Sequence, residues 1–275
     1  MAYNRREHVV SFSDLDLSRL EALDDIWTDS LWNIPARSKD GGHKLDYHGN
    51  FVPQIATQTF QRFTKAGDIV LDLFLGSGTS AIEALNLGRR CIGVELKPDL
   101  VEYVESKLPP EAVGKEVALI RGDSTSSATK RKVAEALKGM NAAAAQLLVL
   151  HPPYHDIIRF SDMAEDLSNA GDVQEFLKLF NKAAHNGYDL LDPGRFAILV
   201  IGDKYTGGEL VPLGFLCMQQ MNEVGFSTKS IIVKNIEGNE RGKGKTNNLW
   251  RYRALKGGFY IFKHEYVIVF RKPGK

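Results

Sequence analysis

The sequence predicts an α/β fold built on a mostly parallel, twisted sheet with helices on both faces. Short and nearly continuous apolar runs are typical of strands that are buried on both faces. Each of the first five such runs is followed by a segment of helical periodicity. Alternating strands and helices form crossover units, and the strands of such units are parallel.

The elements follow one another in a regular order. The expected strands are residues 68–73, 90–95, 117–120, 147–150, 195–201, 230–233 and 266–271. The expected helices are residues 15–26, 51–63, 79–87, 100–108, 130–140, 173–190 and 210–224. The last two strands would close the sheet as a pair. We expect an N-terminal extension at 1–46 and a single domain at 47–275, with a basic loop at 234–256 inserted near the C-terminus.

The totals exclude some classes of protein. The 275 residues include 35 Lys+Arg and 34 Asp+Glu, so contact with nucleic acid would depend on local clusters of charge. Cys91 and Cys217 lie in apolar patterns and are expected to be buried free thiols, without a disulfide or a metal site. No apolar run approaches the roughly 20 residues of a membrane span. We expect a cytoplasmic protein that binds no membrane and no metal.

A glycine-rich turn follows the first strand of the expected domain. Gly76 and Gly78 let the turn tighten and let backbone approach a ligand. Glu95 closes the next strand, 19 residues after Gly76, where an acid can accept hydrogen bonds from ribose hydroxyls. The pattern predicts a site for a nucleoside cofactor, and a dinucleotide remains an alternative. Asp72, at the end of the strand, would suit a cationic ligand better than a pyrophosphate.

The tetrapeptide His151-Pro152-Pro153-Tyr154 follows an apolar strand directly, so we expect it at the carboxyl edge of the sheet. The prolines remove two N–H donors and leave carbonyl acceptors. Tyr154 offers a flat face on which an extruded base can stack. Acceptors at this position can hold the hydrogens of an exocyclic amine and aim its lone pair at a methyl group. His155, the next residue, is expected to be a solvated loop residue.

Residues 72–80, DLFLGSGTS, resemble the cofactor motif D-P-F-x-G-S-G-T-T of the amino-group DNA methyltransferases, and the tetrapeptide is similar to their (D/N/S)-P-P-(Y/F/W) motif. Leu73 and His151 depart from the two patterns. The resemblance implies a Rossmann-like methyltransferase fold and S-adenosylmethionine as cofactor. It implies cofactor contacts for Phe51, Pro53, Asp72, Phe74, Gly76, Ser77, Gly78, Thr79, Glu95 and Asp123. A turn residue or a helix cap is an equal alternative for Asp123.

The resemblance also implies methyl transfer to a flipped base in double-stranded DNA, in a solitary enzyme or one paired with a restriction or defence system. Histidine at the first position does not decide between adenine N6 and cytosine N4, and adenine is slightly favoured. Neutral His151 can accept one hydrogen bond, whereas its imidazolium form cannot, so activity should fall at acid pH. The alternatives are an RNA or protein-glutamine acceptor and a noncatalytic DNA-binding relative.

The expected loop at 234–256 has seven basic residues against two acidic ones, a local excess of five positive charges. This composition favours contact with DNA phosphates and bases, and a solvated mobile loop is the alternative. The candidate DNA contacts are Lys243, Lys245, Asn247, Trp250, Arg251 and Arg253. Residues 162–174 and a second copy of the chain in a homodimer are further candidates for choosing the target.

Overall fold

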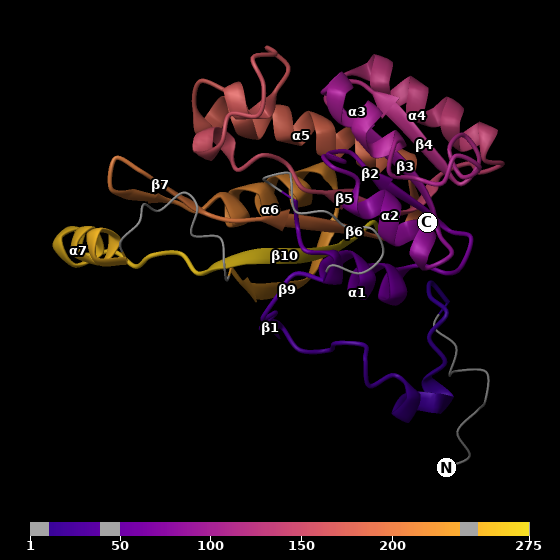
Figure 1. Cartoon of the computed structure of the whole chain (residues 1–275), viewed down its shortest axis with the longest axis horizontal. Coiled ribbons are helices and arrows are strands. Elements are labelled where there is room, and N and C mark those ends of the chain that lie inside the picture. Colours follow the sequence, from indigo (N-terminus) through magenta and orange to yellow (C-terminus); the bar gives the residue numbers. More distant parts are fainter. Residues whose placement is uncertain (1–10, 39–49, 237–246, 275) are drawn as a thin grey trace.

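The computed structural model describes residues 11–38, 50–236 and 247–274, with Asn247 described by its backbone only. An eight-stranded sheet of order β1-β9-β10-β6-β5-β2-β3-β4 forms the centre (Figure 1). Its strands are β1 Leu31–Trp32, β2 Ile69–Asp72, β3 Arg90–Glu95, β4 Val117–Arg121, β5 Ala145–Leu150, β6 Leu191–Ile201, β9 Ser227–Asn235 and β10 His264–Arg271. The helices are α1 Pro53–Phe63, α2 Thr79–Asn86, α3 Pro98–Glu105, α4 Ser127–Gly139, α5 Val173–Leu190, α6 Leu213–Val224 and α7 Asn247–Gly257.

The topology brings the two sequence motifs to one edge of the sheet. Strands β4, β3, β2, β5 and β6 are parallel neighbours, and β10 runs antiparallel between β6 and β9. Strand β2 lies between β3 and β5, in a register that pairs Leu71 with Leu148. The order of the chain therefore reverses next to β2, and ligands of open α/β sheets bind at such a switch point. This arrangement confirms the predicted Rossmann-like fold.

Both faces of the sheet are buried, which explains the continuous apolar runs. On one face, Leu71 and Leu148 pack with Leu137 of α4 and Phe176 of α5. On the other face, the neighbouring strand residues pack against α1, α2 and α3, with Phe60 fully buried. Side chains alternate between the faces of a strand, so each strand needs apolar residues at every position. Cys91 and Cys217 are buried free thiols, as predicted.

The N-terminal segment and the residues after β6 differ from the prediction. Residues 15–26 were expected to form a helix, but only the 3-10 helix η2, Leu17–Ala22, forms there. Within the expected N-terminal extension, β1 pairs in parallel with β9, so this segment contributes a strand to the sheet. A small hairpin, β7 Lys204–Thr206 and β8 Glu209–Val211, was not predicted. Its turn is Gly207-Gly208 with φ of 62° and 90°, a pair that is typical of tight hairpins.

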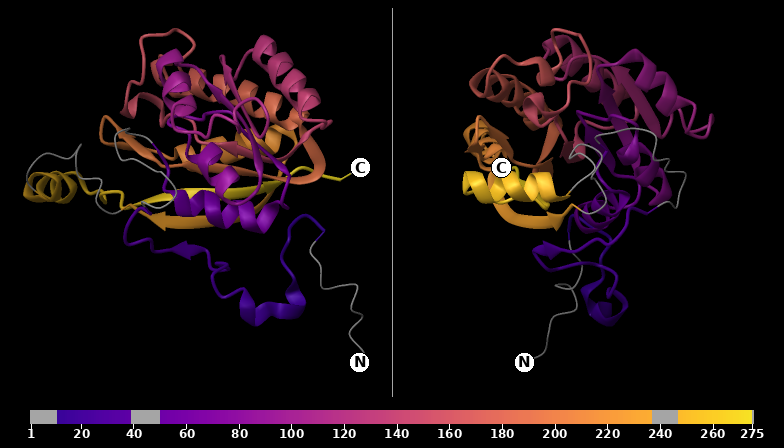
Figure 2. Two further views of the ribbon diagram at one scale, coloured as in Figure 1. Left: turned by 45° about the vertical axis from the view of Figure 1, so that its right-hand side comes forward. Right: turned by 60° about the vertical axis from the view of Figure 1, so that its left-hand side comes forward.

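The expected basic loop at 234–256 is wrong at both of its ends. Lys234 belongs to β9 and is buried, because β9 extends to Asn235 and pairs with β10. Residues 247–257 form α7, which stands apart from the sheet in the left-hand view of Figure 2. Among the residues that the structure describes, no helix has the length and apolarity needed to cross a membrane.

Candidate active site

The glycine turn joins the end of β2 to the start of α2. Gly76 and Gly78 have φ of 56° and 88°, in the left-handed region that side chains disfavour. A Cβ on Gly78 would also lie 2.7 Å from Cγ1 of Val104 on α3. Ser77 and Thr79 are buried beside them. The turn therefore requires glycine at position 78 for both its backbone conformation and its close contact with α3.

Asp72 holds this turn from inside the protein. Its buried carboxylate accepts a hydrogen bond from the Phe74 N–H at 2.9 Å and another from the Ser80 hydroxyl. Burial raises the pKa of Asp72 to about 6, although both hydrogen bonds lower it. Asp72 thus orders the loop, and its expected role towards a cationic ligand stays a prediction.

Glu95, at the end of β3, contacts the same turn from the neighbouring strand. Its Oε2 accepts from the Gly76 N–H at 2.8 Å, and its Oε1 accepts from the Lys97 N–H at 2.9 Å. Burial raises the pKa of Glu95 to about 7, against the opposing effect of these two bonds. Each carboxylate oxygen has a second lone pair, so the side chain can still accept hydrogen bonds from a bound ligand.

Asp123 follows β4 and lies at a cavity of about 350 Å³. The cavity is lined by Leu96, Arg121, Gly122, Asp123, Lys132, Met163 and Glu165. The Asp123 carboxylate accepts from the Thr125 N–H and from the Thr125 hydroxyl, both at 2.8 Å. These are the contacts of a turn residue, the alternative that the sequence allowed. Leu96, the residue that follows Glu95 in the chain, also lines this cavity.

His151 brings the tetrapeptide into contact with the predicted cofactor residues. Its ring meets the ring of Phe51 edge-on, with centroids 5.3 Å apart. Pro53, which the resemblance also predicts to contact the cofactor, is buried at the start of α1. Burial lowers the pKa of His151 to about 4, because the imidazolium form loses its hydration. His151 is therefore neutral near pH 7 and has one ring nitrogen free of a proton.

Tyr154 contacts a residue near the C-terminus of the chain. Its hydroxyl donates to Oε2 of Glu265 at 2.9 Å, and its ring packs on Gly202, where a Cβ would lie 3.0 Å from Cε2. Lys234 Nζ donates to the other carboxylate oxygen of Glu265 at 3.0 Å. Glu265 was not predicted as a site residue, and Lys234 was expected in the basic loop. The sequence pattern that could have revealed both residues is the apolar alternation of β9 and β10, which indicates that Lys234 and Glu265 lie in strands.

His155 is buried, which corrects the expectation of a solvated residue. Its Nε2 lies 2.9 Å from the Ala170 carbonyl, and its Nδ1 lies 2.8 Å from Nζ of Lys204. Lys204 is buried and also forms an ion pair with Asp156. The backbone of His155 has a φ of 54°, which is uncommon outside glycine. This cluster fastens the segment that follows the tetrapeptide to the β7 strand.

The candidate DNA contacts that the structure describes lie on α7, apart from this site. Lys243 and Lys245 fall outside the described residues. Asn247 is the first residue of α7. Arg251 and Arg253 are exposed on α7, and the Arg253 guanidinium lies 5.2 Å from the Trp250 ring centroid. In Figure 1, α7 lies at the far end of β10 from the β2 and β5 strands.

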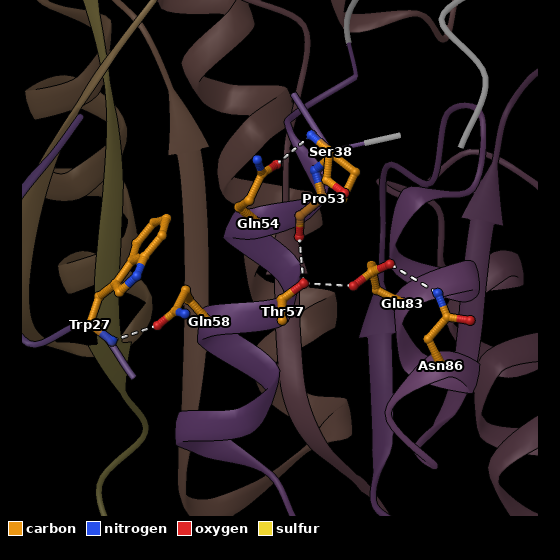
Figure 3. Close-up of a pocket in the computed structure, with 8 residues that line it drawn as sticks. All are labelled: Trp27, Ser38, Pro53, Gln54, Thr57, Gln58, Glu83 and Asn86. Atoms are coloured by element: carbon orange, nitrogen blue, oxygen red, sulfur yellow. Dashed lines mark hydrogen bonds between the residues drawn. The ribbon is translucent and has the colours of Figure 1, made fainter. Parts of the chain in front are cut away.

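A second cavity, of about 340 Å³, lies between the N-terminal segment and helices α1 and α2 (Figure 3). Its polar side chains bond to one another: the Thr57 hydroxyl donates to Glu83 at 2.6 Å, and the Asn86 amide donates to Glu83 at 3.1 Å. The Trp27 N–H donates to Gln58 at 2.7 Å. The bond from Thr57 joins α1 to α2, and the bond from Trp27 joins the N-terminal segment to α1.

The fold is that of a Rossmann-like α/β protein, in which a glycine turn and an acidic strand end lie beside a proline-rich loop at one edge of the sheet. The chain matches the family model described as DNA methylase over residues 4–106. It is 31% identical over 110 residues to the type II methyltransferase M.BglI of Bacillus subtilis, covering 39% of this chain and 30% of that protein. It is 30% identical over 96 residues to M2.DpnII of Streptococcus pneumoniae, covering 35% of this chain and 34% of that protein.

The chain thus spans about a third of the length of these two relatives. Among solved structures, the [4+2]-cyclase SpnF is similar with a TM-score of 0.51, 12% identity and coverage of 87% of this chain and 89% of that one. At that identity the likeness concerns the fold alone. The matched N-terminal part of the chain, residues 4–106, is thus similar to DNA methylases, and the similarity to the two methyltransferases covers about a third of the chain.

Proposed function

We propose that this protein transfers a methyl group from S-adenosylmethionine to an exocyclic amine of a base in double-stranded DNA. One observation carries the proposal: the glycine turn after β2 and the tetrapeptide after β5 meet at adjacent strand ends, where Phe51 contacts His151. A cofactor held by the first motif would then face an acceptor held by the second. Methyl transfer needs that proximity and an in-line approach more than any covalent intermediate.

The residues of the first motif fit the cofactor. The Glu95 carboxylate lies where it can accept from ribose hydroxyls, and the cavity beside Asp123 can take the adenine ring. The turn at Gly76 to Gly78 presents backbone rather than side chains, so a ligand can approach it closely. When bound, S-adenosylmethionine supplies an electrophilic sulfonium methyl group.

The residues of the second motif would hold the acceptor. Neutral His151 accepts one hydrogen of the amine, and a carbonyl of the Pro152-Pro153 pair accepts the other. The nitrogen lone pair is thereby released from conjugation and directed at the methyl group. The Tyr154 ring would stack on the base, which must leave the duplex to reach this site. Adenine N6 is slightly favoured over cytosine N4.

DNA contact would come from a surface outside the cofactor edge. Helix α7 has three basic residues, Arg251, Arg253 and Lys256, and no acidic one. Together with Lys243, Lys245, Asn247 and Trp250, they form the candidate DNA-binding set. A second copy of the chain could supply further contacts. The similarity to type II methyltransferases agrees with a solitary enzyme or with one that is paired with a restriction or defence system.

The deciding experiment measures transfer of labelled methyl from S-adenosylmethionine to mixed-sequence double-stranded DNA, followed by nucleoside mass spectrometry. N6-methyladenine or N4-methylcytosine would support the proposal and identify the base. RNA and a glutamine-containing peptide serve as competing acceptors. Absence of label in DNA, with calorimetric cofactor binding intact, would favour one of those acceptors or a noncatalytic DNA-binding protein.

A further inference from the structure

A series of four hydrogen-bonded side chains leads from the tetrapeptide to strands β10 and β9. His151 Nε2 lies 3.4 Å from the Tyr154 hydroxyl oxygen, which is 2.9 Å from Oε2 of Glu265. Oε1 of Glu265 is 3.0 Å from Lys234 Nζ. The antiparallel register of β9 and β10 places Lys234 directly opposite Glu265, so the pair is built into the sheet.

The chemistry of the four side chains sets the direction of each hydrogen bond between them. The Lys234 ammonium can only donate, and the Glu265 carboxylate can only accept. The single hydroxyl proton of Tyr154 is therefore used on Glu265, and the Tyr154 oxygen presents a lone pair to the imidazole. His151 is neutral, so the ring nitrogen facing that lone pair, Nε2, must carry the proton. Its other nitrogen, Nδ1, is then a bare acceptor.

We propose that Lys234 and Glu265 are positioning residues that act through Tyr154 to hold His151 as the Nε2–H tautomer, with Nδ1 kept as the acceptor for the substrate amine. The inference rests on the proposed function and deepens it. In the opposite tautomer, an Nδ1–H donor would face the N–H donors of the amine. The histidine that departs from the family motif thus needs a partner that selects its tautomer, as a carboxylate does for the histidine of hydrolase triads.

The burial of the pair agrees with a role beyond stability. The side chains of Lys234 and Glu265 are only 6% and 12% exposed. Removing two charges from water costs free energy that their attraction does not reliably return, so apolar residues would serve stability as well. A buried carboxylate that cannot donate has, in contrast, a specific use here, because it orients the Tyr154 hydroxyl.

Glu265→Gln tests the direction of these hydrogen bonds and changes the shape of the side chain only a little. Lys234 would still donate to the amide oxygen, so the amide N–H₂ group would face Tyr154. The Tyr154 hydroxyl would then have to donate to His151 Nε2 and force the proton onto Nδ1. We expect kcat for methyl transfer to fall on the order of 100-fold, with KM for DNA and cofactor affinity nearly unchanged.

The double variant distinguishes this role from simple packing. Tyr154→Phe keeps the ring but removes the hydroxyl that transmits the direction, so His151 can adopt either tautomer and activity should fall less than in Glu265→Gln. The double variant Glu265→Gln/Tyr154→Phe should then match Tyr154→Phe and recover part of the lost activity. If the two losses instead multiply, Glu265 acts through packing and the proposal is overturned.

A readout independent of methyl transfer is the ¹⁵N NMR of the full chain labelled at histidine, with His151→Asn to assign the signal. We expect the Nε2–H tautomer in the natural protein and the Nδ1–H tautomer in Glu265→Gln. An Nδ1–H tautomer in the natural protein, or no change in the variant, would overturn the inference. If the tautomers are as expected but no acceptor is methylated, the proposed function has failed while the hydrogen-bond direction stands.

Discussion

Glu95→Gln should change how the stability of the protein depends on pH. Burial raises the pKa of the Glu95 carboxyl from 4.5 to about 7 in the folded protein. Between these two values the folded chain keeps a proton that the unfolded chain releases. Stability therefore falls as pH rises through this window and levels off above about pH 7.

The magnitude follows from the size of the pKa change. A difference of one pKa unit corresponds to about 1.4 kcal/mol, so the rise at Glu95 corresponds to about 3 kcal/mol of unfolding free energy. The glutamine variant cannot titrate and lacks this dependence. The glutamine amide has a single acceptor oxygen, so only one of the backbone N–H groups of Gly76 and Lys97 keeps its hydrogen bond. The loss of the other bond lowers the unfolding free energy of the variant by about the same amount at every pH.

The assay is urea unfolding of both proteins without ligand, followed by circular dichroism at pH 5, 6, 7 and 8. Subtracting the two curves removes the contribution of most other groups, including much of that of Asp72. Glu102→Gln, which removes an exposed carboxylate of α3, controls for the change in net charge. Parallel curves for the natural protein and Glu95→Gln would refute the reasoning. If the natural protein instead became more stable relative to Glu95→Gln as the pH rises, the two N–H donors would outweigh desolvation in setting the pKa of Glu95.

Three further predictions concern the turn, the base and the DNA. Gly78→Ala should lower the unfolding free energy by about 2–4 kcal/mol, because the left-handed backbone is strained and the new methyl group overpacks against Val104. The control Gly67→Ala should lose about 1 kcal/mol, because Gly67 also has a positive φ, of 78°, but has nothing within 4 Å. Equal shifts of the urea midpoint in the two variants would contradict the clash. Tyr154→Ala should lose most methyl transfer while calorimetric cofactor binding persists, and near-normal turnover would remove the stacking role. Neutralising Arg251 and Arg253 to Gln should weaken DNA binding and reduce the salt slope by about 2; an unchanged slope would reassign α7.

The turn and the tetrapeptide could be predicted because each depends on local chemistry. Gly76 and Gly78 are required by positive φ, and Glu95 ends a strand whose apolar run is continuous in the sequence. The alternation of apolar runs and helical segments was also sufficient for the order of the elements from α1 to β6. Helix α7 was missed because its apolar and basic residues are not separated onto opposite faces, so it has no apolar stripe that would pack against a core.

What the sequence by itself determined is the set of parts: a parallel α/β sheet, a glycine turn with a following acid, and a proline-rich loop at a strand end. Only the tertiary structure decided which distant residues complete the site. Tyr154 and Glu265 are 111 residues apart, and Lys234 meets Glu265 through the pairing register of β9 and β10. A strand register depends on how whole faces are buried, so no local pattern could reveal that a buried carboxylate sets the Tyr154 hydroxyl and, through it, His151.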